Sequence, residues 1–166
     1  DGRYLLGVHI ADVTEYVKPG TALDAEAFER GTSVYLADRV IPMLPFELSN
    51  EMCSLKPHVN RLALSVFMKI SENGEIEFDR LVKSVIRSAE RMTYNITADI
   101  LENSESRYKR KYAKIMPMLE NMKKLSQILF ERRQKRGSIN FDFPEAKIIC
   151  DEKGQPVDVV KTGRKI

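Results

Sequence analysis

Alternating apolar and polar residues predict β-strands in two parts of the first half of the chain. Over residues 62–70 every second residue is apolar, and the Asn-Gly pair that follows predicts a tight turn into a return strand near Ile76. The alternation changes phase beyond Arg80, which indicates a bulge or a bend. Over residues 4–11 both alternating sets are largely apolar, so this strand is expected to be covered on both faces.

Helical spacing follows two threonines that are typical of a helix N-terminus. After Thr21 the apolar positions continue at roughly helical spacing as far as Val34 and Tyr35. The stretch 38–57 then holds three prolines and no clear period, so we expect an irregular loop. Thr93 is expected to begin a short second helix.

A long amphipathic helix is predicted between Ile115 and Leu129, where apolar residues recur every three or four positions. Pro117 is expected in its first turn or at a kink, and Gly137 ends the helical pattern. Three short strands are predicted after it, the first over 139–143. This order of elements indicates an α+β fold, a mainly antiparallel sheet with hairpins packed against a few helices.

The composition agrees with a globular protein, since 43% of the 166 residues are hydrophobic and 31% are charged. No run of about 18 apolar residues occurs, so no membrane span is expected. Two cysteines and no visible signal peptide favour a reducing compartment, and we expect a cytoplasmic location. The chain begins with Asp1 rather than Met, which suggests a piece of a longer protein.

Basic residues are concentrated in one segment. Between residues 107 and 136 there are eleven Lys or Arg and two acids, a net charge of +9, whereas the whole chain carries only +3. Such a segment is either a surface for a polyanion or a solvated helix face, and charge alone does not decide between them. Lys123 and Lys124, within the predicted long helix, are the candidate phosphate contacts.

The common motifs of cofactor and metal chemistry are missing. There is no Gly-rich phosphate loop, no dinucleotide-binding fingerprint and no nucleophile elbow, so no small-molecule cofactor is expected. His9 and His58 do not lie at metal-ligand spacing from the cysteines, and no paired aspartates occur, so no metal site is expected in this chain. His9, in an apolar strand, is expected to be a core histidine.

Six short motifs occur in order along the chain: GVHIADV at 7–13, SVYL at 33–36, IPMLP at 41–45, LS at 48–49, CSL at 53–55 and RGSINFDFPEAK at 136–147. Together they closely resemble the RNB domain, the catalytic domain of the ribonuclease II/ribonuclease R family. The resemblance covers essentially the whole chain. Residues 1–166 therefore look like an internal segment of one RNB catalytic domain of a bacterial ribonuclease R-like exoribonuclease.

The resemblance implies hydrolytic, processive 3′→5′ degradation of single-stranded RNA to nucleoside 5′-monophosphates, with Mg²⁺ held by an aspartate cluster. In the family this cluster ends in an Asp-Asp pair that would lie before Asp1, and an essential arginine lies beyond Ile166. The chain is therefore expected to hold no catalytic residue and to be inactive alone. The alternatives are a non-catalytic RNA-binding module with RNB architecture and a structural domain whose basic helix binds another protein.

Two aromatic residues match positions with which the family grips RNA. Tyr35 matches the tyrosine that packs on the 3′-terminal nucleotide, and Phe141 matches the phenylalanine at the other end of the base stack; by pattern alone, either could be an ordinary packing residue. Asp12 is expected either to cap the turn after its strand or to lie near the metal site. Arg61 is expected to contact phosphate or to pair with an acid at the surface.

Overall fold

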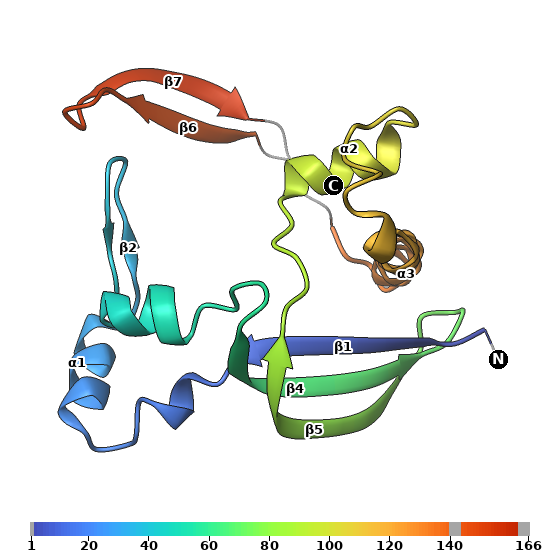
Figure 1. Cartoon of the computed structure of the whole chain (residues 1–166), viewed down its shortest axis with the longest axis horizontal. Helices are drawn as coiled ribbons and strands as arrows, with labels where there is room; N and C mark the ends of the chain where they lie inside the picture. Colours follow the sequence, from blue (N-terminus) through green and yellow to red (C-terminus); the bar gives the residue numbers. More distant parts are fainter. Residues whose placement is uncertain (1, 140–143, 163–166) are drawn as a thin grey trace.

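The structure is a computed structural model that describes residues 2–139 and 144–162 (Figure 1). Its strands form three separate antiparallel sheets, ordered β1-β4-β5, β2-β3 and β6-β7, so the predicted α+β class is confirmed. The strands are β1 Tyr4–Ala11, β2 Val34–Tyr35, β3 Val40–Ile41, β4 Asn60–Ile70, β5 Ile76–Arg87, β6 Glu145–Cys150 and β7 Pro156–Thr162. The helices are α1 Ala22–Arg30, α2 Tyr94–Glu102 and α3 Met116–Lys135, with single helical turns η1 Val13–Glu15, η2 Glu47–Met52 and η3 Ala113–Ile115.

The central sheet is built on the β4–β5 hairpin that the alternation predicts. Gly74 takes a φ of 77° in its turn, a conformation that glycine adopts without strain. Along the hairpin Phe67 pairs with Arg80 but Met68 pairs with Phe78, so Asp79 has no partner opposite it. The predicted bulge is therefore present, one residue earlier than the phase change suggests.

Strand β1 lies at the edge of this sheet and pairs with β4 along its whole length. The prediction that it is covered on both faces is wrong, because Leu5 and Ile10 are each 64% exposed. His9 is likewise exposed rather than a core residue, and its Nδ1 lies 2.6 Å from the Ser65 hydroxyl. An apolar strand pattern indicates that a face can be buried. Whether it is buried depends on which element packs on that face, and in the described chain these side chains of β1 stay exposed.

The first helix, α1, begins at the predicted cap but ends earlier than the apolar spacing suggests. Gly31 follows it with a φ of 68°, which stops the helix. Val34 and Tyr35 therefore lie in strand β2 and pair with β3, so their predicted place in the helix is wrong. The stretch 38–57 is also more regular than predicted, because it contains β3 and the π-helical turn η2.

A compact apolar cluster holds α2 against the start of α3. Ile100, Tyr112 and Leu119 are buried at its centre. The Thr93 hydroxyl caps α2 as predicted, by accepting the Ile96 N–H at 3.3 Å, and Pro117 lies in the first turn of α3, one of the two places expected for it. No helix in the described ranges is long and apolar enough to cross a membrane.

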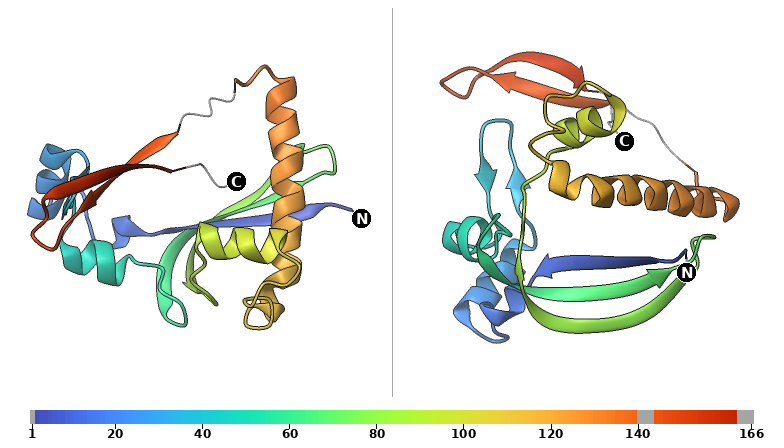
Figure 2. Two further views of the ribbon diagram at one scale, coloured as in Figure 1. Left: turned by 90° about the horizontal axis from the view of Figure 1, so that it is seen from above. Right: turned by 45° about the vertical axis from the view of Figure 1, so that its right-hand side comes forward.

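Two contacts bring distant segments together. Figure 2 shows α3 running across one end of the central sheet, where Arg132 donates a hydrogen bond to the Gly74 carbonyl in the β4–β5 turn. The β6–β7 hairpin lies beyond the β2–β3 hairpin, and its turn at Gly154 lies against Asp38. The described chain is thus an open arrangement of small units rather than one continuous core.

Candidate nucleic-acid interface

Tyr35 lies on the β2–β3 hairpin, which projects away from α1 (Figure 1). The residue is 79% exposed, and its neighbours Val34, Leu36 and Val40 are exposed as well. The alternative that Tyr35 is a core residue at the end of a helix is therefore wrong for the described chain. An open aromatic face is what stacking on a nucleotide base requires. Phe141, the second predicted stacking residue, lies outside the described residues.

Asp12 follows β1 at the end of the central sheet. Its backbone N–H donates to the Leu62 carbonyl at 3.1 Å, and its buried carboxylate accepts a hydrogen bond from the Thr14 hydroxyl at 2.6 Å. The Lys83 ammonium lies 3.5 Å from this carboxylate and 3.0 Å from Glu15. These contacts are those of a residue that organises turn η1 and joins it to β5.

The surroundings of Asp12 favour its charged form. The Thr14 hydroxyl has the largest effect and, together with Lys83, holds the pKa of the Asp12 carboxyl below its usual value, although burial acts in the opposite direction. Glu15 raises the pKa of Lys83, and Asp12 adds to this effect. Acid and base therefore stabilise each other's ionised states at this end of the sheet.

We expect Asp12 to stabilise the fold near neutral pH and to lose this effect in acid. Because its pKa is lower in the folded chain than in the unfolded chain, where it is about 3.9, the stabilisation is complete above that value and is lost as the pH falls through the folded pKa. Asp12→Asn should therefore lower the urea midpoint at pH 7, and the difference from the parent chain should shrink toward pH 3. Glu29→Gln, at an exposed site, controls for the loss of one carboxylate. An equal difference at both pH values would contradict the prediction.

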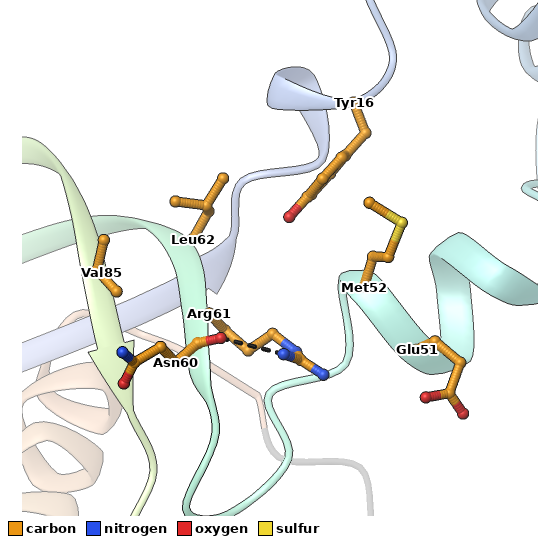
Figure 3. Close-up of a pocket in the computed structure, with 7 residues that line it drawn as sticks. All are labelled: Tyr16, Glu51, Met52, Asn60, Arg61, Leu62 and Val85. Atoms are coloured by element: carbon orange, nitrogen blue, oxygen red, sulfur yellow. Dashed lines mark hydrogen bonds between the residues drawn. The ribbon is translucent and has the colours of Figure 1, made fainter.

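Arg61 borders an open pocket of about 420 Å³ at the same end of the sheet. Figure 3 shows Leu62 and Val85 on one side of it, Tyr16 and Met52 on the other, and Arg61 between them. Arg61 Nε donates to the Ser54 carbonyl and Nη1 to the Asn60 carbonyl, both at 3.0 Å. Pairing with an acid is not observed among residues 2–139 and 144–162. A guanidinium has five N–H donors, so donors are left that can bind a phosphate.

Asp12 and Arg61, two of the candidates from the sequence, are brought together near Cys53. Burial raises the pKa of the Cys53 thiol, while the charge of Arg61 lowers it and that of Asp12 raises it. Both charges therefore act on the same small region. The partner that sequence reasoning missed is Lys83, although its position between Leu81 and Val85 on the same strand face was a usable signal.

Lys123 and Lys124 lie on α3, away from this cluster. Both are exposed, whereas Leu119 and Leu125 of the same helix are buried, so the helix is amphipathic as predicted. Neither lysine forms an ion pair within the part of the chain that the structure describes. Their charges are therefore open to solvent or to a polyanion.

The described residues do not by themselves form a site for Mg²⁺. Within 2–139 and 144–162 no three His, Cys, Asp or Glu side chains lie where they could share one metal ion. Asp12 and Glu15, which do lie close to one another, share the cation of Lys83 instead.

The model of the RNB domain family matches residues 1–165, and the chain belongs to this family. Its relatives include ribonuclease R proteins. It is 48% identical to Ribonuclease R 1 of Lactococcus lactis over 166 residues and 49% identical to Ribonuclease R of Thermotoga maritima over 167. Both alignments cover all of this chain but only 20% and 23% of those proteins, so the chain spans about a fifth to a quarter of their length.

Solved structures show the same fold. RNase R of Mycoplasma genitalium in complex with ribose-methylated single-stranded RNA matches with a TM-score of 0.88 and 32% identity, over 97% of this chain and 25% of that one. The same enzyme with double-stranded RNA matches with a TM-score of 0.86 over 95% and 28%. Yeast Ssd1, described as a pseudonuclease, matches with a TM-score of 0.65 over 81% and 16%, and at 22% identity this likeness shows the fold alone. The resemblance to the RNB family is confirmed, but the fold by itself does not establish catalysis.

Proposed function

We propose that this chain is part of the catalytic domain of a hydrolytic 3′→5′ exoribonuclease, which degrades single-stranded RNA processively to nucleoside 5′-monophosphates. The observation that carries the proposal is its identity of nearly one half, over the whole chain, with ribonuclease R proteins. A relative of the same fold has been solved with single-stranded RNA, which supports RNA as the substrate. An RNA substrate and two free cysteines also support a cytoplasmic location.

In this proposal the chain supplies the part of the channel that grips RNA. Tyr35 would stack on the 3′-terminal nucleotide and Phe141 on the other end of a short run of bases. Stacking contributes about 1–3 kcal/mol per base and tolerates any sequence, which suits an enzyme that degrades RNA from its end. Mg²⁺ would be held by aspartates outside the described residues, and it would neutralise phosphate charge and activate water.

The proposal is tested by following labelled RNA with the full-length protein and Mg²⁺. A single strand labelled at its 3′ end should release labelled mononucleotide at once. The same strand labelled at its 5′ end should remain at full length until the enzyme degrades that molecule completely, without a ladder of intermediate lengths. DNA of the same sequence is the matched control for the substrate. Internal fragments from either label, or no hydrolysis, would contradict the proposal.

The second candidate is an RNA-binding module without catalysis. It agrees with the absence of a metal cluster within 2–139 and 144–162, an absence that the first proposal also expects because it places the metal ligands outside these residues. It predicts that the full-length protein binds single-stranded RNA but releases no nucleotide at any Mg²⁺ concentration. The 166-residue chain alone is expected not to hydrolyse RNA under either hypothesis, so only the full-length protein distinguishes them.

Replacing both Lys123 and Lys124 by alanine is expected to weaken the salt dependence of RNA binding. If each lysine neutralises one phosphate of a single strand, the slope of log K against log salt concentration should fall by about 0.7 per lysine, or about 1.4 for the pair. Binding isotherms at several salt concentrations measure this slope. The Lys123→Arg/Lys124→Arg variant keeps both charges and should keep the slope. An unchanged slope in the alanine variant would show that this helix face is only solvated.

A further inference from the structure

We infer that Arg30 is a positioning residue for Tyr35. Through its pairing with Glu26 and its hydrogen bond to the Pro42 carbonyl, directly after β3, and together with Ser33, Arg30 holds the base of the β2–β3 hairpin so that the Tyr35 ring is presented in one orientation. The inference rests on the function proposed above, in which Tyr35 stacks on RNA.

Few contacts within the β2–β3 hairpin fix its orientation relative to the rest of the chain. Its two strands pair through two residue pairs, Val34 with Ile41 and Tyr35 with Val40. All four of these side chains are 45% exposed or more, so none of them is seated in a buried core. An isolated two-stranded hairpin is marginally stable in water even when it is longer. Its direction must therefore come from contacts outside the strand pair.

Polar contacts at the base supply that direction. Arg30 is the last residue of α1. Its Nε donates to the Glu26 carboxylate, one turn earlier, at 2.7 Å, and its Nη1 donates to the Pro42 carbonyl at 3.1 Å. The Ser33 hydroxyl accepts the Met43 N–H at 2.9 Å. One bond thus ties α1 to the chain leaving β3, and the other ties the residue before β2 to that same segment.

The tip of the hairpin is also confined. Gly154, in the β6–β7 turn, has a φ of 77°, and a methyl group placed on it would lie 3.1 Å from the Asp38 carboxylate. The hairpin therefore lies between α1 at its base and the β6–β7 turn at its tip (Figure 1). A ring carried between two such supports is oriented before RNA arrives.

Orientation before binding matters because a mobile stacking residue must be ordered when the ligand binds, which lowers affinity. The Glu26–Arg30 pair is about half exposed, and such pairs contribute little to overall stability. Its loss should therefore leave folding nearly intact and be felt in RNA binding. This separates a positioning role from a merely structural one.

The experiment uses the full-length exoribonuclease and a short single-stranded RNA. Arg30→Ala should raise KM roughly two- to tenfold and change kcat little, while Arg30→Lys, which can still pair with Glu26, should restore part of the loss. In the Tyr35→Ala background, Arg30→Ala should have no further effect, because its action passes through that ring. Gln127→Ala is the matched control, since it breaks a similar one-turn pair with Glu131 on α3, away from the hairpin.

Each outcome supports or overturns either the positioning role of Arg30 or the stacking role of Tyr35. If Tyr35→Ala raises KM but neither Arg30→Ala nor Ser33→Ala does, the positioning role is overturned and the stacking function stands. If the Arg30 and Tyr35 effects multiply in the double variant, Arg30 acts independently of the ring and the inference is also overturned. If Tyr35→Ala itself leaves KM unchanged, the proposed stacking function fails and the inference fails with it. Should Arg30→Ala fold poorly, Ser33→Ala, which removes only the acceptor for the Met43 N–H, should give the same selective rise in KM.

Discussion

Replacing Tyr35 by alanine in the full-length protein is expected to weaken binding of single-stranded RNA by about 1–3 kcal/mol, roughly 5- to 150-fold in Kd. The reason is the loss of one stacking face. Because the residue is 79% exposed and lies on a projecting hairpin, its removal leaves no core cavity, and stability should hardly change. Fluorescence anisotropy of a labelled RNA measures the effect directly.

Two further tyrosine variants control this prediction. Tyr35→Phe keeps the aromatic face and should bind nearly as well as the parent protein. Tyr94→Ala removes an equally open tyrosine, 85% exposed at the start of α2, and should have little effect. Equal losses from Tyr35→Ala and Tyr94→Ala would mean that position on the hairpin is irrelevant, which would contradict the stacking role.

Among the substitutions proposed for this chain, Leu119→Ala should lower stability the most, by about 2–5 kcal/mol of the free energy of unfolding. Leu119 is 5% exposed and packs with Ile100 and Tyr112 in the cluster that joins α2 to α3. Truncation there removes buried methyl groups and leaves a cavity that two helices and their connection cannot easily close. Urea unfolding of the chain, followed by circular dichroism, gives the change.

The adjacent residue provides the control for this experiment. Met118 is 53% exposed and loses a side chain of similar size when replaced by alanine, but this replacement should cost less than about 0.5 kcal/mol of the free energy of unfolding. A similar loss for both variants would show that the α2–α3 cluster does not stabilise the chain.

Part of the candidate site could be predicted from the sequence. Tyr35 was selected through its family motif, and the structure adds that the ring is open. Asp12 and Arg61 were selected separately, and only the pairing of β1, β4 and β5 shows that they lie at one end of the same sheet. Lys83 and Arg30 were missed because each acts on a segment distant in sequence, Asp12 in one case and Pro42 in the other.

Local signals by themselves determined most of the elements. The alternation over β4, the Gly74 turn, the Thr93 cap and Pro117 in the first turn of α3 are each set by interactions within a few residues, so periodicity and turn chemistry predict them. The basic character of α3 is likewise a property of the sequence.

Only the tertiary structure decided which apolar surfaces are covered and which short segments pair. Strand β1 has the pattern of a buried strand but lies exposed at a sheet edge, and Val34 and Tyr35 have helical spacing but form a hairpin with β3. Burial and strand pairing depend on what approaches from elsewhere in the chain, and a periodic pattern carries no information about that partner. For the same reason the orientation of Tyr35, on which the proposed grip on RNA depends, is inferred to follow from contacts of Arg30, Ser33 and the β6–β7 turn with segments distant in sequence from them.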